Sequence, residues 1–117
     1  MAEITSAAYQ DLRDYIQANW SYIALKSESN EEIIRIPTSD EKVAWLHEEG
    51  TPILTLELRL TGLDFDTKPQ IVSKAELYKT LESANPLVSE SFAAVTIEVD
   101  ADKLVVTLNI QVPQQVI

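Results

Sequence analysis

The chain has 117 residues, of which 45% are apolar and 24% are charged, and its formal net charge is −10. This length predicts a single domain over residues 1–117 with one core, and the composition excludes wholesale disorder. Lysines and arginines are scattered singly, so the chain lacks the basic patch that would favour nucleic acid or an anionic membrane as a partner. The absence of cysteine excludes disulfides, thiolate nucleophiles and zinc sites with cysteine ligands.

The N-terminal stretch 5–19 has the spacing of an amphipathic helix. Its apolar residues recur every three or four positions and form one stripe, made of Ala8, Leu12, Tyr15 and Ile16. Thr5 is a suitable N-cap, and Asn19 can adopt the left-handed conformation that ends many helices. We expect the stripe to face the protein's own core and the helix to cover one end of a sheet. The alternative is that the helix binds a partner.

Alternation of apolar and polar residues with period two predicts four strands in the first half of the chain. They cover residues 20–26, 33–36, 42–48 and 53–61. The last is the most regular, because its four even-numbered leucines, Leu54 to Leu60, fall on one face. Polar turns separate these strands in pairs, so we expect one hairpin from the first two and a second hairpin from the other two.

Residues 71–79 carry two conflicting signals. Ser73 followed by Glu76 has the form of a helix-capping box. Ala75 and Leu77 alternate with polar neighbours, which favours a strand. We interpret this segment as a strand and keep a helix as the alternative.

The C-terminal part of the chain contains the strongest strand pattern. After a predicted loop over residues 82–90, residues 92–99 and 104–112 alternate strictly and flank a short polar turn. We expect these two strands to pair as an antiparallel hairpin. The expected cross-strand pairs are Val99 with Leu104, Ile97 with Val106, and Val95 with Leu108.

The two faces of the last strand differ in character. One row is apolar and is expected to line the core: Leu104, Val106, Leu108, Ile110 and Val112. The opposite row is uncharged, which is unusual in so acidic a chain: Val105, Thr107, Asn109 and Gln111. A solvated strand commonly carries Lys or Glu to block edge pairing, so this second row is a candidate protein–protein interface. The alternative is an ordinary solvent-exposed β surface.

These patterns predict an α+β fold, mainly an antiparallel β-sandwich or partial barrel with one N-terminal α-helix. Each amphipathic hairpin has one apolar face that must be covered, and a second amphipathic sheet is the natural cover.

No residue pattern predicts a catalytic or metal site, so we expect no cofactor and no enzymatic activity. The only histidine, His47, has no cysteine or serine-elbow nucleophile to act with, which favours a structural role over a small hydrolase built around it. Two D-x-D pairs, Asp64/Asp66 and Asp100/Asp102, lie in predicted turns, where aspartate commonly binds the nearby backbone rather than calcium. Two glycines are too few for a phosphate-binding loop.

Four aromatic residues form a candidate aromatic surface on which a sugar could stack: Trp20, Tyr22, Trp45 and Tyr78. Packing in the core or at an interface is the favoured interpretation, because aromatic side chains dominate both environments.

Four stretches of the chain resemble small structural proteins of the head–tail and tail region of tailed bacteriophages and prophages of Gram-positive bacteria. They are YQDLRDYIQANWSYIALKSESNEEIIRI, VAWLHEEGTPILTLELRLTG, AELYKT and DKLVVTLNIQVP. The resemblance lies in the order of a helix, an aromatic strand, a Trp-containing strand, a Leu-rich strand and a last hairpin. It implies a non-enzymatic virion protein whose partners are other virion proteins and itself. A carbohydrate- or surface-binding β module is the alternative function.

The sequence also predicts where the protein is located. The first residues lack the basic and apolar segments of a signal peptide, and no apolar run approaches the ~20 residues that cross a bilayer. We expect synthesis in the bacterial cytoplasm and, from an active phage, location in the virion.

Overall fold

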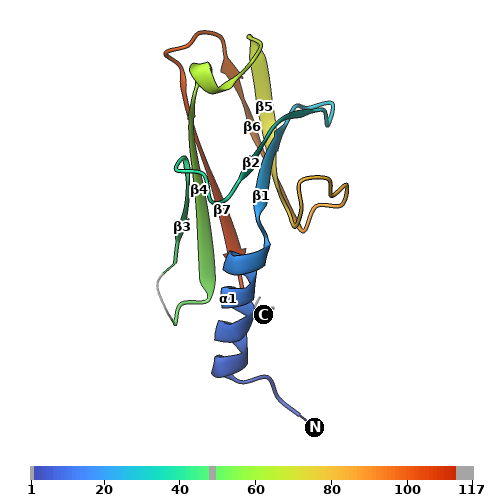
Figure 1. Cartoon of the computed structure of the whole chain (residues 1–117), viewed down its shortest axis with the longest axis vertical. Helices are drawn as coiled ribbons and strands as arrows, with labels where there is room; N and C mark the ends of the chain where they lie inside the picture. The colour runs from blue at the N-terminus through green and yellow to red at the C-terminus, as the bar shows by residue number, and fades with distance from the viewer. Residues whose placement is uncertain (1, 48–49, 113–117) are drawn as a thin grey trace.

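A computed structural model of the chain describes residues 2–47 and 50–112. Within these ranges it contains one α-helix, one short 3-10 helix and seven strands, and Figure 1 shows the helix at one end of two facing sheets. The elements are α1 (Ser6–Asn19), β1 (Tyr22–Lys26), β2 (Glu32–Pro37), β3 (Val43–Leu46), β4 (Ile53–Thr61), η1 (Gly62–Asp64), β5 (Gln70–Tyr78), β6 (Val88–Ile97) and β7 (Lys103–Gln111). The predicted α+β class, an antiparallel sandwich with one N-terminal helix, is confirmed.

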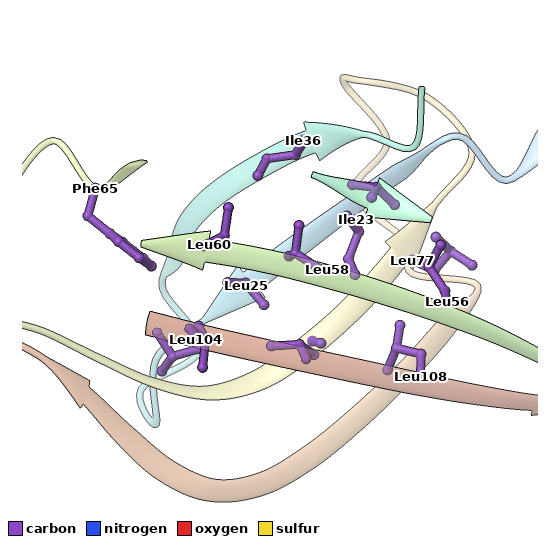
Figure 2. Packing of buried hydrophobic residues seen from close by; sticks show 14 of the residues in the cluster. Ile23, Leu25, Ile36, Leu56, Leu58, Leu60, Phe65, Leu77, Leu104 and Leu108 are labelled. Atoms are coloured by element: carbon purple, nitrogen blue, oxygen red, sulfur yellow. The ribbon is translucent and has the colours of Figure 1, made fainter. Parts of the chain in front are cut away.

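The strands form two antiparallel sheets with the core between them. The four-stranded sheet has the order β2-β1-β5-β6, and the three-stranded sheet has the order β3-β4-β7. Figure 2 shows leucines of β4 and β7 packed against Ile23 and Leu25 of β1. The four leucines of β4 are buried, as their alternation predicts. Burial of this apolar surface is the main stabilising contribution to the fold.

The ambiguous segment 71–79 is a strand, and the strand predicted over 53–61 coincides with β4. β5 lies inside its sheet between β1 and β6. Pairing with a strand on each side outweighs the helix-capping signal of Ser73 and Glu76. The predicted loop over 82–90 is too long, because β6 begins at Val88, which pairs with Leu77.

Two strands are shorter than predicted. β1 begins at Tyr22, because Trp20 closes α1 by donating its backbone N–H to the carbonyl of Ile16 at 3.0 Å. β3 ends at Leu46, and residue 48 of the predicted range lies outside the described residues. Both hairpins expected in this half, β1 with β2 and β3 with β4, are confirmed.

The predicted C-terminal hairpin is wrong. β7 pairs with β4 along its whole length, while β6 pairs with β5 in the opposite sheet. The β4–β7 register runs from Thr61 opposite Lys103 to Ile53 opposite Gln111. Alternation defines the two faces of a strand but does not select its neighbour. β4 pairs with β7 without a bulge, whereas β6 has a register shift against β5.

Residues 98–102 therefore cross from one sheet to the other. The carboxylate of Asp102 accepts hydrogen bonds from the backbone N–H groups of Glu98 at 2.8 Å and Val99 at 3.1 Å. These bonds hold the crossing in place, and they lower the pKa of the Asp102 carboxyl, since they favour its charged form.

The predicted core row of the last strand is confirmed for its first three residues. Leu104, Val106 and Leu108 are 5%, 5% and 1% exposed, whereas Ile110 and Val112 are only partly buried. The apolar row thus becomes less well covered toward the end of the strand.

Helix α1 begins with the predicted N-cap, since the Thr5 hydroxyl accepts a hydrogen bond from the N–H of Ala8. Its buried face differs from the predicted stripe: Ile16 is buried, but Leu12 and Tyr15 are 45% and 48% exposed. Arg13 is buried instead, because its guanidinium donates to the backbone carbonyl of Val112. A pattern of apolar residues could not reveal that a hydrogen bond to the end of the last strand selects the buried face.

The end of α1 also differs from the prediction. Asn19 does not adopt a left-handed conformation, because its φ is not positive; among the described non-glycine residues, Asn30 has a positive φ. The Asn19 amide instead donates to the carbonyl of Tyr15 at 2.9 Å, and the chain leaves the helix in an extended conformation at Trp20.

We predict that Gly62→Ala destabilises the protein by about 1–3 kcal/mol or more, through overpacking. A Cβ at Gly62 would lie 2.0 Å from the backbone carbonyl oxygen of Val99, which the crossing segment holds in place. Leu63→Ala is the matched control. Because Leu63 is 74% exposed, its substitution should change stability by less than about 0.5 kcal/mol. Chemical denaturation measures both. Equal effects of the two variants would contradict this account of the crossing.

Candidate protein-interaction surface

The last strand, β7, lies at the edge of the three-stranded sheet. Within the described residues it pairs with β4 on one side and with no strand on the other. The ladder runs over nine residues without a bulge. The four residues proposed from the sequence as an interface, Val105, Thr107, Asn109 and Gln111, are all exposed and lie along this strand.

The hydrogen bonds at the two ends of the ladder show which backbone groups of β7 bond to β4 and which point to its open edge. Gly62 N–H donates to the carbonyl of Asp102 at 2.9 Å, and Val112 N–H donates to the carbonyl of Pro52 at 2.6 Å. In an antiparallel ladder this pattern marks Thr61–Lys103 and Ile53–Gln111 as non-hydrogen-bonded pairs. The even-numbered residues of β7 therefore bond to β4, and the odd-numbered residues direct their N–H and C=O groups to the open edge.

The side chains of these same odd-numbered residues lie on the outer face of the three-stranded sheet. We define this outer face by the outward residues of its strands: Ala44, Leu46, Ile53, Thr55, Glu57, Arg59, Thr61, Lys103, Val105, Thr107, Asn109 and Gln111. Leu46, Ile53 and Val105 expose 51%, 44% and 52% of their surface.

Charge is nearly absent from the outer face. Its charged residues are Glu57, Arg59 and Lys103, which sum to +1, in a chain of net charge −10. Glu57 and Arg59 neutralise each other in an ion pair of 2.5 Å. Most acidic residues that keep the protein charged therefore lie elsewhere. With Glu57 and Arg59 paired, Lys103 at the start of β7 is the remaining charge, so the middle of this face can meet another surface without burying unpaired charge.

A groove runs between β7 and β6, the edge strand of the other sheet. It contains an open cavity of about 390 Å³, whose lining includes Glu90, Phe92 and Val95 of β6 and Leu104 and Val106 of β7. Phe92, Val95 and Ile110 are only partly buried, because neither sheet is closed on this side. The sequence did not indicate this groove, since it depends on two edges meeting.

The other three sheet edges have features that hinder pairing with a further strand. β3 has four residues, and β2 ends in Pro37 and has a register shift against β1. β6 contains a bulge: Ser91 and Val95 are four residues apart, whereas the residues they pair with on β5, Lys74 and Val72, are two residues apart. β7 is the one described edge strand that is long, regular and free of proline.

The four residues of the proposed aromatic surface do not share one face. Tyr78 is 1% exposed, with the Arg35 guanidinium carbon 3.8 Å from its ring centroid, so its place in an exposed surface is wrong. Trp20 packs partly buried against the core. Tyr22 and Trp45 line the same cavity, of about 340 Å³, near the end of α1.

A buried polar cluster on the outer side of the four-stranded sheet explains the position of Tyr78. Glu76 is 4% exposed, forms an ion pair with Lys26 at 2.5 Å and accepts a hydrogen bond from the Tyr78 hydroxyl at 2.8 Å. Arg35 donates to the backbone carbonyls of Leu81 at 2.9 Å and of two other residues of the loop after β5, which lies over the cluster. All polar groups are satisfied, so the cluster anchors a loop and presents no reactive group.

The protonation of this cluster follows from its contacts. Burial acts to raise the pKa of the Glu76 carboxyl, but hydrogen bonds from Lys26, Tyr78 and Ser89 outweigh burial, and the pKa is lowered. The hydrogen bond to Glu76 raises the pKa of the Lys26 ammonium, and burial raises the pKa of the Tyr78 hydroxyl. Glu76 and Lys26 are thus held in their charged forms.

Several of the residues considered for catalysis or metal binding have local structural partners, although Nε2 of His47 is buried without a hydrogen-bond partner among the described residues. His47 Nδ1 lies 3.4 Å from the carbonyl of Ile53. Asp64 accepts a hydrogen bond from the N–H of Thr61 at 2.8 Å and pairs with Lys42, as expected of a turn aspartate. Among the described residues, no group of three or more His, Cys, Asp or Glu side chains could hold a metal ion.

No family model, curated protein or solved structure matches this chain. In the described residues no helix has the length and apolar character needed to cross a membrane.

We predict that Glu76→Gln destabilises the protein by about 1–3 kcal/mol at pH 7, because it leaves the partly buried Lys26 without its counter-charge. A carboxyl whose pKa is lowered on folding stabilises the protein at pH values above its pKa in the unfolded state. This stabilisation is lost as the pH falls through its pKa in the folded state. The difference in Tm between wild type and variant should therefore shrink as the pH falls below about 4.5. A difference that stays constant from pH 7 to pH 3 would contradict this role of Glu76.

Proposed function

We propose that this chain is a non-enzymatic structural protein that assembles through protein–protein contacts made by β7 and the outer face of the three-stranded sheet. The observation that supports the proposal is the coincidence of free backbone groups and uncharged side chains on the same residues. Val105, Thr107 and Asn109 each direct their backbone N–H and C=O groups to the open edge and carry an uncharged, exposed side chain. Such an edge offers hydrogen bonds to a further strand with no charge to be desolvated.

The edge of β7 lacks the features that usually prevent one sheet from pairing with another. Charged residues, proline, bulges and short length are the usual devices that keep sheet edges apart, and the other edges here use all four between them. The interior of β7 uses none, and its one charged residue, Lys103, is its first. The exposed apolar side chains of Leu46, Ile53 and Val105 add surface whose burial favours association.

The proposed biological setting is the virion of a tailed bacteriophage or prophage, in the tail or head–tail region. The resemblance of the helix, the Leu-rich strand and the last strand to such proteins supports it, and an assembly surface suits a virion component. The position of the gene tests this setting: we expect it between capsid and tail genes. A neighbourhood of metabolic genes would argue against a virion protein.

A second candidate function, a carbohydrate-binding module, is favoured by one observation. Tyr22 and Trp45 line the same cavity together with polar residues such as Gln17, Ser21 and Thr38. Aromatic rings beside hydroxyl and amide groups are suited to a sugar ring. Binding on a glycan array that is lost in Trp45→Ala and kept in Thr107→Lys would favour this function over assembly.

We predict that Thr107→Lys abolishes incorporation of the protein into particles while its fold stays intact. Thr107 is exposed, so its substitution should change stability by less than about 0.5 kcal/mol, but a lysine there puts a charge in the middle of the edge. Thr96→Lys, the same change on the exposed side of β6, is the matched control and should be incorporated normally.

Leu108→Asp serves as the folding control for the same experiment. Leu108 is 1% exposed, so an unpaired carboxylate there should cost about 4–5 kcal/mol or more and unfold the domain. Circular dichroism separates this loss of fold from loss of assembly. If folded Thr107→Lys protein enters particles as well as wild type at equal expression, β7 is not the assembly surface.

A further inference from the structure

We infer that the strand that adds to β7 is β7 of a second copy of this chain, antiparallel, with a two-fold axis at Thr107. This inference rests on the proposed function and names the partner of its surface. The two three-stranded sheets would then form one continuous sheet of the order β3-β4-β7-β7-β4-β3.

The backbone supports this pairing. The odd-numbered residues of β7 direct their N–H and C=O groups to the open edge. In β7 of a second copy the odd-numbered residues do the same, so the two edges can form an antiparallel ladder with each other. Thr107 is the midpoint of Lys103–Gln111, so an axis there pairs the whole strand end to end. Thr107 then faces Thr107 of the second copy as a hydrogen-bonded pair, and Val105 faces Asn109 of the second copy.

The side chains fit this register on both faces. On the outer face, Lys103 meets Gln111 of the second copy, so no like charges are opposed. On the inner face, Leu104 meets Ile110 of the second copy, and Val106 meets Leu108 of the second copy, so apolar residues meet apolar residues. Ile110, which is only partly buried in the single chain, gains an apolar neighbour.

A second copy fits better than a partner of opposite charge. Although each copy carries a net charge of −10, the outer face sums to +1, and its acidic residue, Glu57, is already paired with Arg59. The strand itself presents no negative charge that would select a basic peptide. The acidic residues elsewhere limit further, non-specific association, because they keep the remaining surfaces mutually repulsive.

The register predicts opposite outcomes for two double variants that change the same positions. V105K/N109K places lysine opposite lysine twice across the axis, whereas V105K/N109E places lysine opposite glutamate twice. In sedimentation velocity over a range of concentrations, we expect wild type to form a dimer. V105K/N109K should dimerise about tenfold more weakly, and V105K/N109E should dimerise about as well as wild type. Equal weakening in both variants, or monomeric wild type at all concentrations, would overturn the inference.

Single cysteines test the axis independently, since the natural chain has none. In a hydrogen-bonded antiparallel pair the Cα atoms lie about 5.5 Å apart, within disulfide range. Thr107→Cys should therefore cross-link on mild oxidation. Val105→Cys should not, because the two substituted positions would lie four residues out of register. Ala44→Cys, on the opposite edge strand, should not either. Cross-linking of all three alike, or of none, would overturn the inference.

The outcomes separate this inference from the proposed function. If wild type stays monomeric but Thr107→Lys still fails to enter particles, the second copy is not the partner, and assembly through β7 stands. If the dimer forms in the predicted register but Thr107→Lys enters particles normally, the self-pairing stands and the proposed role in assembly is wrong.

Discussion

The pairing of β4 with β7 is the constraint on which the rest of this structure depends. Its uninterrupted register aligns the leucine row of β4 with the apolar row of β7, so that one side of the three-stranded sheet is wholly apolar and must be covered. The four-stranded sheet supplies that cover with Ile23, Leu25 and Leu77, which Figure 2 shows facing the leucines. Because β7 pairs with β4 alone among the described strands, the same pairing leaves its second edge open.

The crossing between β6 and β7 follows from this constraint. Once β7 belongs to the sheet of β4, the residues before it must step from one layer to the other. Gly62 allows the backbone of Val99 to approach closely, and Asp102 binds the N–H groups at the start of the step. The two edge strands therefore flank a groove instead of closing the sandwich, and the apolar residues at its floor stay partly exposed.

Polar groups are used differently on the two outer sides of the sandwich. The four-stranded sheet buries charge in a closed cluster, in which Glu76 is satisfied by Lys26 and Tyr78, and Arg35 holds the following loop. The three-stranded sheet instead presents a nearly neutral outer face beside an open edge. One side is closed by its own chain, and the other is suited to contact with another molecule, which is why the functional proposal rests on β7.

The sequence by itself determined the faces of the strands, the leucine row of β4, the core row of β7 and the N-cap at Thr5, because alternation and capping are local properties. It also singled out the uncharged row of Val105, Thr107, Asn109 and Gln111.

Only the tertiary structure decided which strands pair, since a strand with two faces carries no local record of its neighbour. For that reason the expected C-terminal hairpin was wrong, and the groove between β6 and β7 could not be foreseen. The burial of Arg13 and Tyr78 likewise depends on partners far along the chain, Val112 and Arg35. The neutrality of an entire sheet face and the opening of one edge appear only when three strands are placed side by side.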